Sequence, residues 1–524
     1  MKTPVQPIGG RLIQKILFGL AVVTFCVFDP GIRAECREGC GGNNHTFLGE
    51  DALLNVGIGE LNTAIGYHAL EDTVGGNFNT ALGAYALQSH LGSGFGGGST
   101  AAGYSALRDN TEGDSNTAIG DSALRVNTTG SYNTATGSSA LYQNGTGTLN
   151  TANGYAALGG NTASYNTASG AWALEGGDGF VTGSYNTATG VYALYHDASG
   201  WNNVATGAYA MEENTDGSYN TATGAAALND NTSGSYNTAT GFWSMLSNTT
   251  GGSNTANGYY ALYANQTGGS NTALGASALL NNTTGGSNVA VGTLALSQTN
   301  LSNNTAVGSN ALLNSTGSDN IALGTNAGQF LTTGSNNIAI GSKGTASDNK
   351  TIRIGTGGMQ TQTFIAGIRG ITVASGINVL IATNGKMGTT TSSARFKENI
   401  QPMDEASEAI LALEPVTFRY KKELDPEAIP QFGLVAEDVA NVNPDLVARD
   451  EEGKPYSVRY DAVNAMLLNE FLKEHRRNEQ QETMIVEQQK QIQTLTAALN
   501  KQAAQIQKVS AQLAAASPSG GKLD

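Results

Sequence analysis

The stretch Asn220-Thr-Ala-Thr-Gly-Ala-Ala-Ala-Leu228 shows the pattern that decides the fold. The same unit, Asn-Thr-Ala-x-Gly-x-x-Ala-Leu, recurs at Asn62–Leu70, Asn116–Leu124 and Asn271–Leu279. Aligned on the first position, 18 units begin at residues 45, 62, 79, 99, 116, 133, 150, 166, 186, 203, 220, 237, 254, 271, 288, 304, 320 and 337. Most steps are 17 residues, three are 16 and two are 20. A fixed period of this kind predicts a stacked array in which each unit contacts only its neighbours.

Each unit predicts one short strand and one turn. In Thr-Ala-x, the Thr and x side chains should face one way and the Ala the other. The x position is apolar near both ends of the array, as at Ile65 and Leu323, and polar in the central units, as at Thr223. The apolar x suggests that this face points into a roll, and the Leu of the turn should return to the core. The following Gly permits a tight bend. The predicted fold class is mainly β, with a repetitive parallel β-roll (solenoid) over residues 44–348.

The repeat resembles the head repeats of trimeric autotransporter adhesins. In those heads, short Ala-x-Gly units build a left-handed parallel β-roll with three chains side by side. The resemblance covers roughly residues 44–345, although the period here is longer. The residues after the array contain no set of four amphipathic barrel strands, so we expect no membrane translocator of the autotransporter kind.

Composition and charge narrow the function classes. Of 524 residues, 69 are Gly and only 13% are charged, with a net charge of −15. Residues 44–348 hold 18 Asp and Glu against three Lys and Arg, whereas the rest of the chain has 24 of each sign. An acidic rod repels phosphate, so we expect no nucleic-acid partner. The three Cys and five His lack the spacing of a zinc module, and we expect neither metal nor cofactor.

Residues 1–34 have the pattern of a secretory signal peptide. Lys2, Arg11 and Lys15 precede an apolar run from Ile16 to Phe28, and Ala34 offers a small residue for cleavage. The alternative is an uncleaved anchor, although the run is short for a membrane span. The predicted localisation is secreted or cell surface. Residues 35–43 form a short tip in which Cys36 and Cys40 close a small loop, cross-link neighbouring chains or remain free thiols.

Several features of the rod resemble binding sites. One set of tyrosines, each just before the Asn of a unit, would either line up to bind sugar rings or stack on one another: Tyr132, Tyr165, Tyr185, Tyr219 and Tyr236. Gly92, Gly94 and Gly97 have the spacing of a dinucleotide loop, but no strand–helix–strand pattern surrounds them, so we interpret them as a loop insertion. Phe95 and Phe180, in the two 20-residue units, are candidate loop tips for contact with a partner.

Residues 349–391 are expected to form a β neck. Its predicted strands are Thr351–Gly355, Thr363–Ala366, Ile371–Ala374 and Val379–Thr383. The dipeptide Asn384-Gly385 between Ile381 and Met387 indicates a hairpin turn.

The composition changes again at Thr391-Ser-Ser-Ala-Arg-Phe-Lys-Glu-Asn-Ile400. This stretch resembles the start of the endosialidase-type intramolecular chaperone, whose pattern is Ser-Asp-x-Arg-Leu-Lys-x-x-Ile. Four residues match, namely Ser392, Arg395, Lys397 and Ile400, whereas Ser393 stands for the Asp and Phe396 for the Leu. The segments Gln431–Val439, Pro444–Val447 and Tyr456–Tyr460 follow in the family's order. The resemblance spans residues 392–476 and implies a small α+β domain.

The resemblance also implies an autoproteolytic serine peptidase that acts only on its own chain. In the family this domain trimerises the fibre and then cuts itself off with a Ser–Lys dyad. The matching residues are Ser392 as nucleophile and Lys397 as base, with cleavage between Thr391 and Ser392. A serine hydroxyl needs a neighbouring base, and burial in a trimer favours the neutral form of lysine. The alternative interpretation makes Ser392 a turn residue and Lys397 a solvated side chain.

Residues 477–515 predict a trimeric coiled coil, followed by a disordered tail at 516–524. One position of the heptad holds Ile485, Ile492, Leu499, Ile506 and Leu513, and the other holds Gln488, Leu495, Gln502 and Val509. This pattern is compatible with three strands. The sequence therefore predicts an exported homotrimeric surface fibre of adhesin type with an unidentified host-cell or glycan receptor. The alternatives are a tailspike-like protein that binds or degrades polysaccharide, and a passive surface or matrix protein.

Overall fold

The computed structural model describes residues 35–37 and 43–516, except 56, 92–96, 178, 367, 369–372, 374, 383 and 451. The predicted signal peptide, Cys40, Gly92, Gly94 and Phe95 lie outside the described residues, as do residues 517–524 of the predicted tail. The chain divides into two compact units, Met1–Phe364 and Ile365–Asp524, and each is considered by itself.

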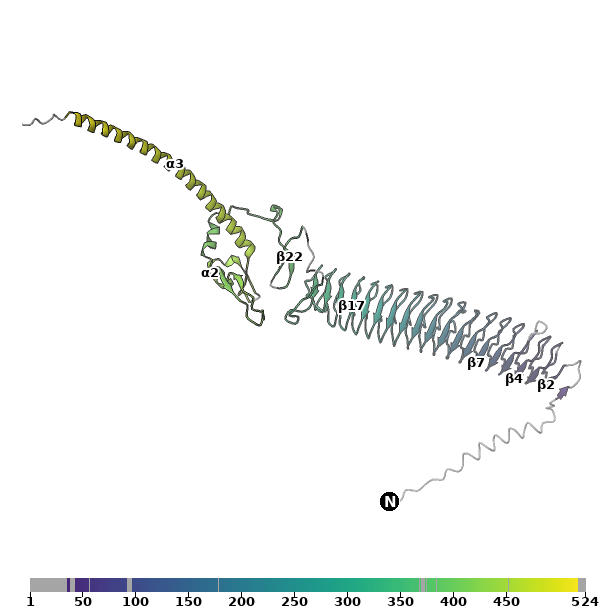
Figure 1. Ribbon diagram of the computed structural model, residues 1–524. Coiled ribbons are helices and arrows are strands. Elements are labelled where there is room, and N and C mark those ends of the chain that lie inside the picture. The colour runs from purple at the N-terminus through teal and green to yellow at the C-terminus, as the bar shows by residue number, and fades with distance from the viewer. Residues whose placement is uncertain are drawn as a thin grey trace, which may run out of the picture. The chain divides into compact units, whose positions relative to one another are not determined.

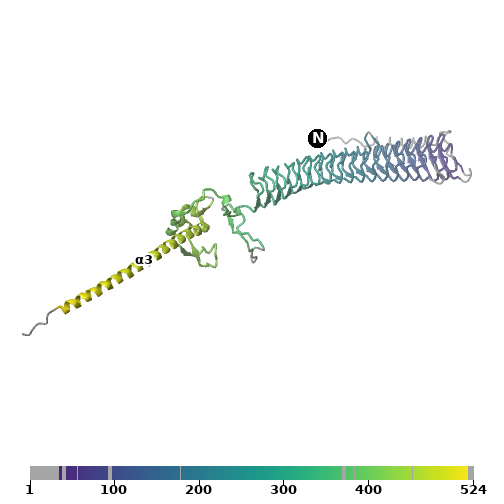
Figure 2. The same ribbon diagram turned by 90° about the horizontal axis from the view of Figure 1, so that it is seen from above.

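The first unit is a parallel β-solenoid in which each strand pairs with the next along the chain (Figures 1 and 2). It confirms the predicted fold class. Its strands are β2 (His45–Leu48), β3 (Thr63–Ile65), β4 (Thr80–Leu82), β5 (Thr100–Ala102), β6 (Thr117–Ile119), β7 (Thr134–Thr136), β8 (Thr151–Asn153), β9 (Thr167–Ser169), β10 (Thr187–Thr189), β11 (Val204–Thr206), β12 (Thr221–Thr223), β13 (Thr238–Thr240), β14 (Thr255–Asn257), β15 (Thr272–Leu274), β16 (Val289–Val291), β17 (Thr305–Val307), β18 (Ile321–Leu323), β19 (Ile338–Ile340) and β20 (Ile352–Ile354). From the second unit on, the central Ala of each unit pairs with the central Ala of the next, as Ala222 does with Ala239, and in the first unit Phe47 pairs with Ala64.

The interior of the solenoid is lined by alanine and leucine. The strand Ala222 and the turn residues Ala227 and Leu228 are fully buried, and the equivalent residues repeat this along the rod. The predicted return of the Leu to the core is confirmed. The prediction that the x side chain points into the roll is wrong, because Leu82 is 51% exposed and Ile119 46%. The narrow rung leaves room only for a methyl group on the inner side of the strand, and the turn supplies the larger apolar side chain.

The glycine after each strand permits close stacking as well as the bend. Gly224 has φ of +134°, a conformation that residues with a Cβ rarely adopt. A Cβ on Gly224 would lie 2.6 Å from the carbonyl oxygen of Gly241 in the next rung. The backbones of successive rungs therefore approach too closely at this column for any other residue.

The recurring Asn forms a buried hydrogen-bond ladder that runs along the rod. The Asn220 Oδ1 accepts the N–H of Asn237 at 2.9 Å, and the Asn220 Nδ2 donates to the Gly234 carbonyl at 2.8 Å. His45 and Ser99 occupy the same position in their units and accept the N–H of the following Asn. The amide side chain thus satisfies backbone groups that the turns would otherwise leave buried without partners.

A second buried ladder follows the outer turns and contains one acidic residue. Asn231 Nδ2 donates to Asn214 Oδ1 at 2.7 Å, and Asn214 Nδ2 donates to Asp197 Oδ1 at 2.8 Å. The Gly200 N–H also donates to Asp197 Oδ1, at 3.1 Å. The other carboxylate oxygen, Oδ2, is buried without a hydrogen-bond partner. Burial raises the pKa of Asp197 to about 8, partly opposed by the bonds from Asn214 and Gly200.

We expect Asp197→Asn to stabilise the rod, and more so at pH 8 than at pH 5. Between the ordinary carboxyl pKa and about 8, the folded chain holds a proton that the unfolded chain releases, so the free energy of unfolding falls as pH rises. An Asn can donate to the Gly200 carbonyl as Asn214 donates to Gly217. The gain should be on the order of 1–3 kcal/mol near neutral pH, the cost of a buried polar group without a partner. Thermal unfolding at several pH values measures it.

The matched control is Asp216→Asn, because Asp216 is an exposed carboxylate near Asp197. It should leave both the midpoint of unfolding and its pH dependence almost unchanged. Equal effects of the two substitutions would contradict the assignment of Asp197 to the ladder.

Both ends of the solenoid carry a strand beyond the predicted units. β1 (Glu35–Arg37), which contains Cys36, pairs antiparallel with β2 and covers its open edge. At the other end, β20 extends the parallel ladder past the last predicted unit. There, Arg353 Nε and Nη2 each donate to Asp348 at 2.6 Å, and this lowers the pKa of Asp348 to about 2.

The second unit opens with the predicted hairpin, formed by β21 (Val379–Ile381) and β22 (Met387–Thr389). Residues 363–366 form no strand, and Ile371–Ala374 lies largely outside the described residues. The hairpin is followed by η1 (Ala394–Phe396), η2 (Asp404–Ala412), β23 (Val416–Phe418), β24 (Gln431–Gly433), α2 (Ala436–Val442), η3 (Pro444–Leu446), β25 (Val447–Arg449), β26 (Pro455–Val458) and α3 (Tyr460–Ala515). A small core joins Val439, Leu446, Val447, Val458 and Met466.

The helix α3 begins against this core and continues for 56 residues (Figure 1). It contains the whole predicted coiled-coil segment, and the helix is consistent with a coiled coil. In the described part of the chain, we find no helix with the length and hydropathy that a membrane span requires.

Candidate functional site

Ser392 and Lys397 lie on either side of a single turn of 3-10 helix. η1 begins after Ser393, and the Phe396 N–H donates to the Ser393 carbonyl at 3.0 Å. Lys397 ends the turn in extended conformation, and its N–H donates to the Ala394 carbonyl. The turn reverses the chain so that two side chains five positions apart point toward each other.

The turn brings the predicted nucleophile and base together. Lys397 Nζ lies 3.5 Å from Ser392 Oγ, at the outer limit of a hydrogen bond. Both residues, with Thr391 and Ser393 beside them, are exposed to solvent in the single chain. A lysine acts as a base only through its neutral amine, since an ammonium has no lone pair to accept the hydroxyl proton. The geometry therefore places the hydroxyl and the amine within reach of each other on an exposed surface.

A partly buried polar network holds η2 against α3 in the same unit. Asn469 Nδ2 donates to Ser407 Oγ at 2.7 Å, and Ser407 in turn donates to the Glu470 carboxylate. Lys473 donates to Glu470 at 2.7 Å and to Glu408 at 3.2 Å. The hydrogen bond from Lys473 is the main cause that lowers the pKa of Glu470. Sequence reasoning missed this network, because its partners are more than 60 residues apart and no motif marks them.

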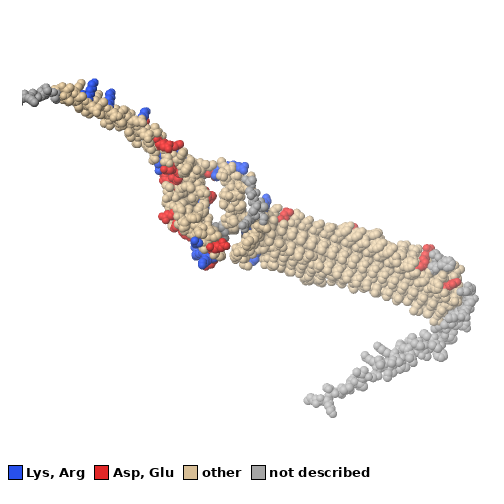
Figure 3. Space-filling view, in the orientation of Figure 1, with Lys and Arg blue, Asp and Glu red and all other residues tan. Residues whose placement is uncertain are grey.

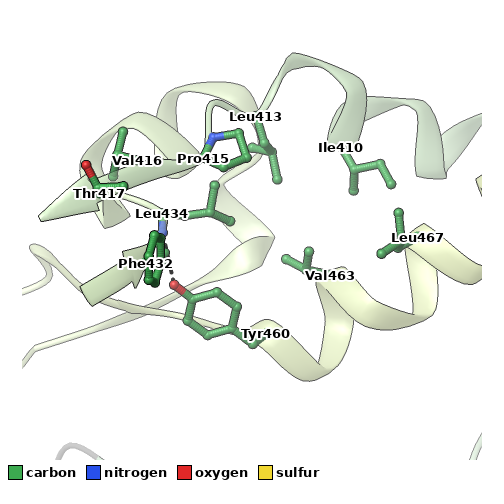
Figure 4. A pocket seen from close by; sticks show the side chains of 11 residues that line it. Ile410, Leu413, Pro415, Val416, Thr417, Phe432, Leu434, Tyr460, Val463 and Leu467 are labelled. Carbon is green, nitrogen blue, oxygen red and sulfur yellow. Dashed lines mark hydrogen bonds between the residues drawn. The ribbon is translucent and has the colours of Figure 1, made fainter. Parts of the chain in front are cut away.

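An apolar pocket of about 570 Å³ lies between the hairpin of β23 and β24, the end of η2 and the start of α3 (Figure 4). Its lining is Ile410, Leu413, Pro415, Val416, Thr417, Phe432, Gly433, Leu434, Tyr460, Val463 and Leu467. The Leu434 N–H donates to the Tyr460 hydroxyl at 3.0 Å. A Cβ on Gly433 would lie 2.8 Å from that hydroxyl oxygen, so only glycine allows the hydrogen bond.

The aromatic side chains of the rod stack on one another. Tyr165 and Tyr185 have ring centroids 4.8 Å apart and planes 5° apart, and Tyr219 and Tyr236 are similar at 5.2 Å and 2°. For these four tyrosines this is the second of the two arrangements considered, whereas no ring contact tests it for Tyr132. Each stacked ring covers a face of its neighbour, whereas a sugar stacks on an open ring face. Sequence reasoning missed a second column, in which Trp172, Tyr192 and Tyr209 stack at 5.1 and 5.5 Å.

The rest of the rod surface carries few charged or metal-ligating side chains. On the face drawn in Figure 3, the solenoid carries only scattered charged side chains. Phe180 is exposed, as predicted for a loop tip. No cluster of three or more His, Cys, Asp or Glu able to hold a metal ion occurs among the residues that the structure describes.

Comparison with known families supports the assignment of the C-terminal domain. Residues 392–448 match a family model described as chaperone of endosialidase, beginning at the predicted nucleophile Ser392. Neither the curated proteins nor the solved structures include a significant match. The likeness of the repeat to adhesin heads stays a prediction. The chain therefore couples a parallel β-solenoid of about 18 turns to a C-terminal domain of the chaperone of endosialidase family.

Proposed function

We propose that the protein is a homotrimeric surface fibre whose C-terminal domain assembles the trimer and then cuts itself off between Thr391 and Ser392. The observation that carries the proposal is the order of parts: a stacked rod, a chaperone of endosialidase domain and a long helix with an exposed apolar seam. This order fits a fibre of tailspike or adhesin type. The adhesin role, with a cell-surface or glycan receptor, is the more specific form of the proposal.

The seam of α3 supports assembly. Ile485, Ile492, Leu499, Ile506 and Leu513 are each more than half exposed in the single chain. Burial of apolar surface contributes roughly 25 cal/mol per Å², so leaving this stripe in water is unfavourable. A coiled coil of parallel copies covers it, and domains of the matched family mediate trimerisation, which favours three copies.

Export is part of the proposal and rests on residues 1–34. Their basic start and apolar run match the pattern of a secretory signal. The proposed location of the fibre is therefore the cell surface or the medium.

The proposed cleavage is a shift of the Thr391 acyl group. The Ser392 Oγ attacks the Thr391 carbonyl carbon, and its proton passes to neutral Lys397 Nζ. The carbon–nitrogen bond then breaks, Lys397 returns the proton to the Ser392 amine, and an ester joins Thr391 to Ser392 Oγ. Water hydrolyses this ester, leaving a carboxylate on Thr391 and the hydroxyl on Ser392. The dyad distance of 3.5 Å supports this role for Lys397.

Expression of chains with a tag at each end tests the cleavage. The unaltered chain should release a C-terminal fragment of 133 residues that begins at Ser392, whereas Ser392→Ala and Lys397→Ala should both stay whole. Ser393→Ala is the matched control, because Ser393 is exposed and makes no side-chain cap bond, and it should cut normally. An unaltered trimer that stays uncut would leave the domain as a chaperone without peptidase activity.

A further inference from the structure

The heptad pattern of α3 extends upstream of the predicted coiled coil, into the chaperone domain. Counting back from Ile485 places Phe471 at the same seam position, called a, and Leu467 and Tyr460 at the other, called d. Leu467 is 57% exposed and Phe471 66%. The a and d register can therefore be counted back into the chaperone domain, although the other seam positions upstream of Ile485 are polar: Asn464, Glu474, Asn478 and Gln481.

The chaperone body covers part of the surface of this stretch of the helix. Its contacts with η2 use Asn469, Glu470 and Lys473, which are the f, g and c positions of the heptad. The d residue Tyr460 also contacts the body, because its hydroxyl accepts the Leu434 N–H. The a residue Phe471 and the e residue Leu468 remain 66% and 59% exposed. Positions e are usually charged in coiled coils, so an exposed Leu there needs an explanation.

The apolar pocket lies on the flank of the same seam. From α3 it is lined by the d residues Tyr460 and Leu467 and by the g residue Val463 (Figure 4). In parallel coiled coils, a g residue of one helix faces the e residue of the following heptad on the neighbouring helix. The counterpart of Val463 in that arrangement is Leu468.

We propose that the pocket receives Leu468 of the partner subunit, so that each chaperone body is completed by the next copy of the chain. This inference rests on the proposed trimer and deepens it by naming the contact. Leu468 supplies an apolar side chain to an apolar cavity, and the same contact removes an exposed Leu from water on every chain.

The charges next along the helix fit the same alignment. The following g residue is Glu470, which then faces His475 of the partner subunit, and after it Arg477 faces Glu482 of the partner subunit. Both pairings place an acidic residue opposite a basic one, as expected for parallel helices in register. Antiparallel or shifted helices would lose this match.

A pair of cysteines tests the contact. Val463→Cys and Leu468→Cys are introduced together into the full chain with Ser392→Ala, and the native Cys26, Cys36 and Cys40 are replaced by Ser. Under mild oxidation, we expect covalent trimers on a non-reducing gel. The two new cysteines lie on different faces of one helix, so they cannot bridge within a chain. The matched control pairs Val463→Cys with Leu472→Cys, whose position faces away from the seam, and it should stay uncross-linked.

A third variant separates failure of this contact from failure of the trimer. Ile492→Cys in the seam should give covalent dimers wherever the coiled coil forms. If light scattering shows a trimer and Ile492→Cys cross-links while the Val463 and Leu468 pair does not, the proposed contact is overturned. If the chain is monomeric and neither variant cross-links, the proposed trimer fails and the contact fails with it.

Discussion

Deletion of Asn220–Tyr236, one whole unit, should shorten the rod by one rung and leave it folded and soluble. The cut joins Tyr219 to Asn237, so the Asn203 side chain can accept the Asn237 N–H as it now accepts that of Asn220. The strand Ala205 would pair with Ala239 in the register that every rung uses. Stability in a stacked array is nearly a sum of nearest-neighbour contributions, so one rung fewer costs little. Circular dichroism and limited proteolysis measure the outcome.

Deletion of only residues 220–227 is the contrasting variant. It leaves a partial rung at the junction, with neither the strand nor the Asn that stacking requires. We expect the rod to divide there, with two open sheet edges, rapid proteolysis at the junction and aggregation. If the two deletions behaved alike, the assignment of the repeat to single rungs would be wrong.

The period of the sequence was sufficient to predict the solenoid and the position of almost every strand. The period could not say which face of Thr-Ala-x lies inside, because alternation along a strand defines two faces without ranking them. Apolar x residues such as Leu82 suggested that the face carrying Thr and x points inward, whereas it is the Ala face that does. The better indicator was the near-constant Ala, since a position that holds only a methyl group in every unit after the first is the one with least room.

The Asn ladders illustrate a second limit of sequence reasoning. The Asn of each unit was visible as the most regular polar residue of the repeat, but its role depends on the distance between rungs. A fixed Asn just before a strand, repeated through many units, is the pattern that indicates such a ladder. Asp197 then stands out, among the described residues, as a carboxylate at a ladder position, and its unusual pKa follows from burial.

The dyad was predictable and the pocket was not. Ser392 and Lys397 are close in sequence, and a single turn suffices to bring them together. The pocket joins residues from Ile410 to Leu467 across four separate elements, so only the folded domain reveals it. The upstream extension of the heptad register can be counted in the sequence. Only the structure shows that η2 leaves part of that surface of α3 exposed.

Acidic substitutions in the seam of α3 should have the second large effect, which is on the number of chains in the assembly. In a chain kept whole by Ser392→Ala, the pair Ile492→Asp and Leu499→Asp should abolish the trimer, because each layer would bury three like charges without partners. Size-exclusion chromatography with light scattering should show the mass falling to about one third. Val486→Asp, at an outward position next to the seam residue Ile485, is the control and should leave the mass unchanged. Retention of the trimer in the double variant would place the assembly contacts elsewhere.

The light-scattering mass of the uncut Ser392→Ala chain tests the central claim most directly. The account predicts three times the mass of one chain at micromolar concentration, with the rod folded by circular dichroism. A folded species with the mass of a single chain under the same conditions would contradict it.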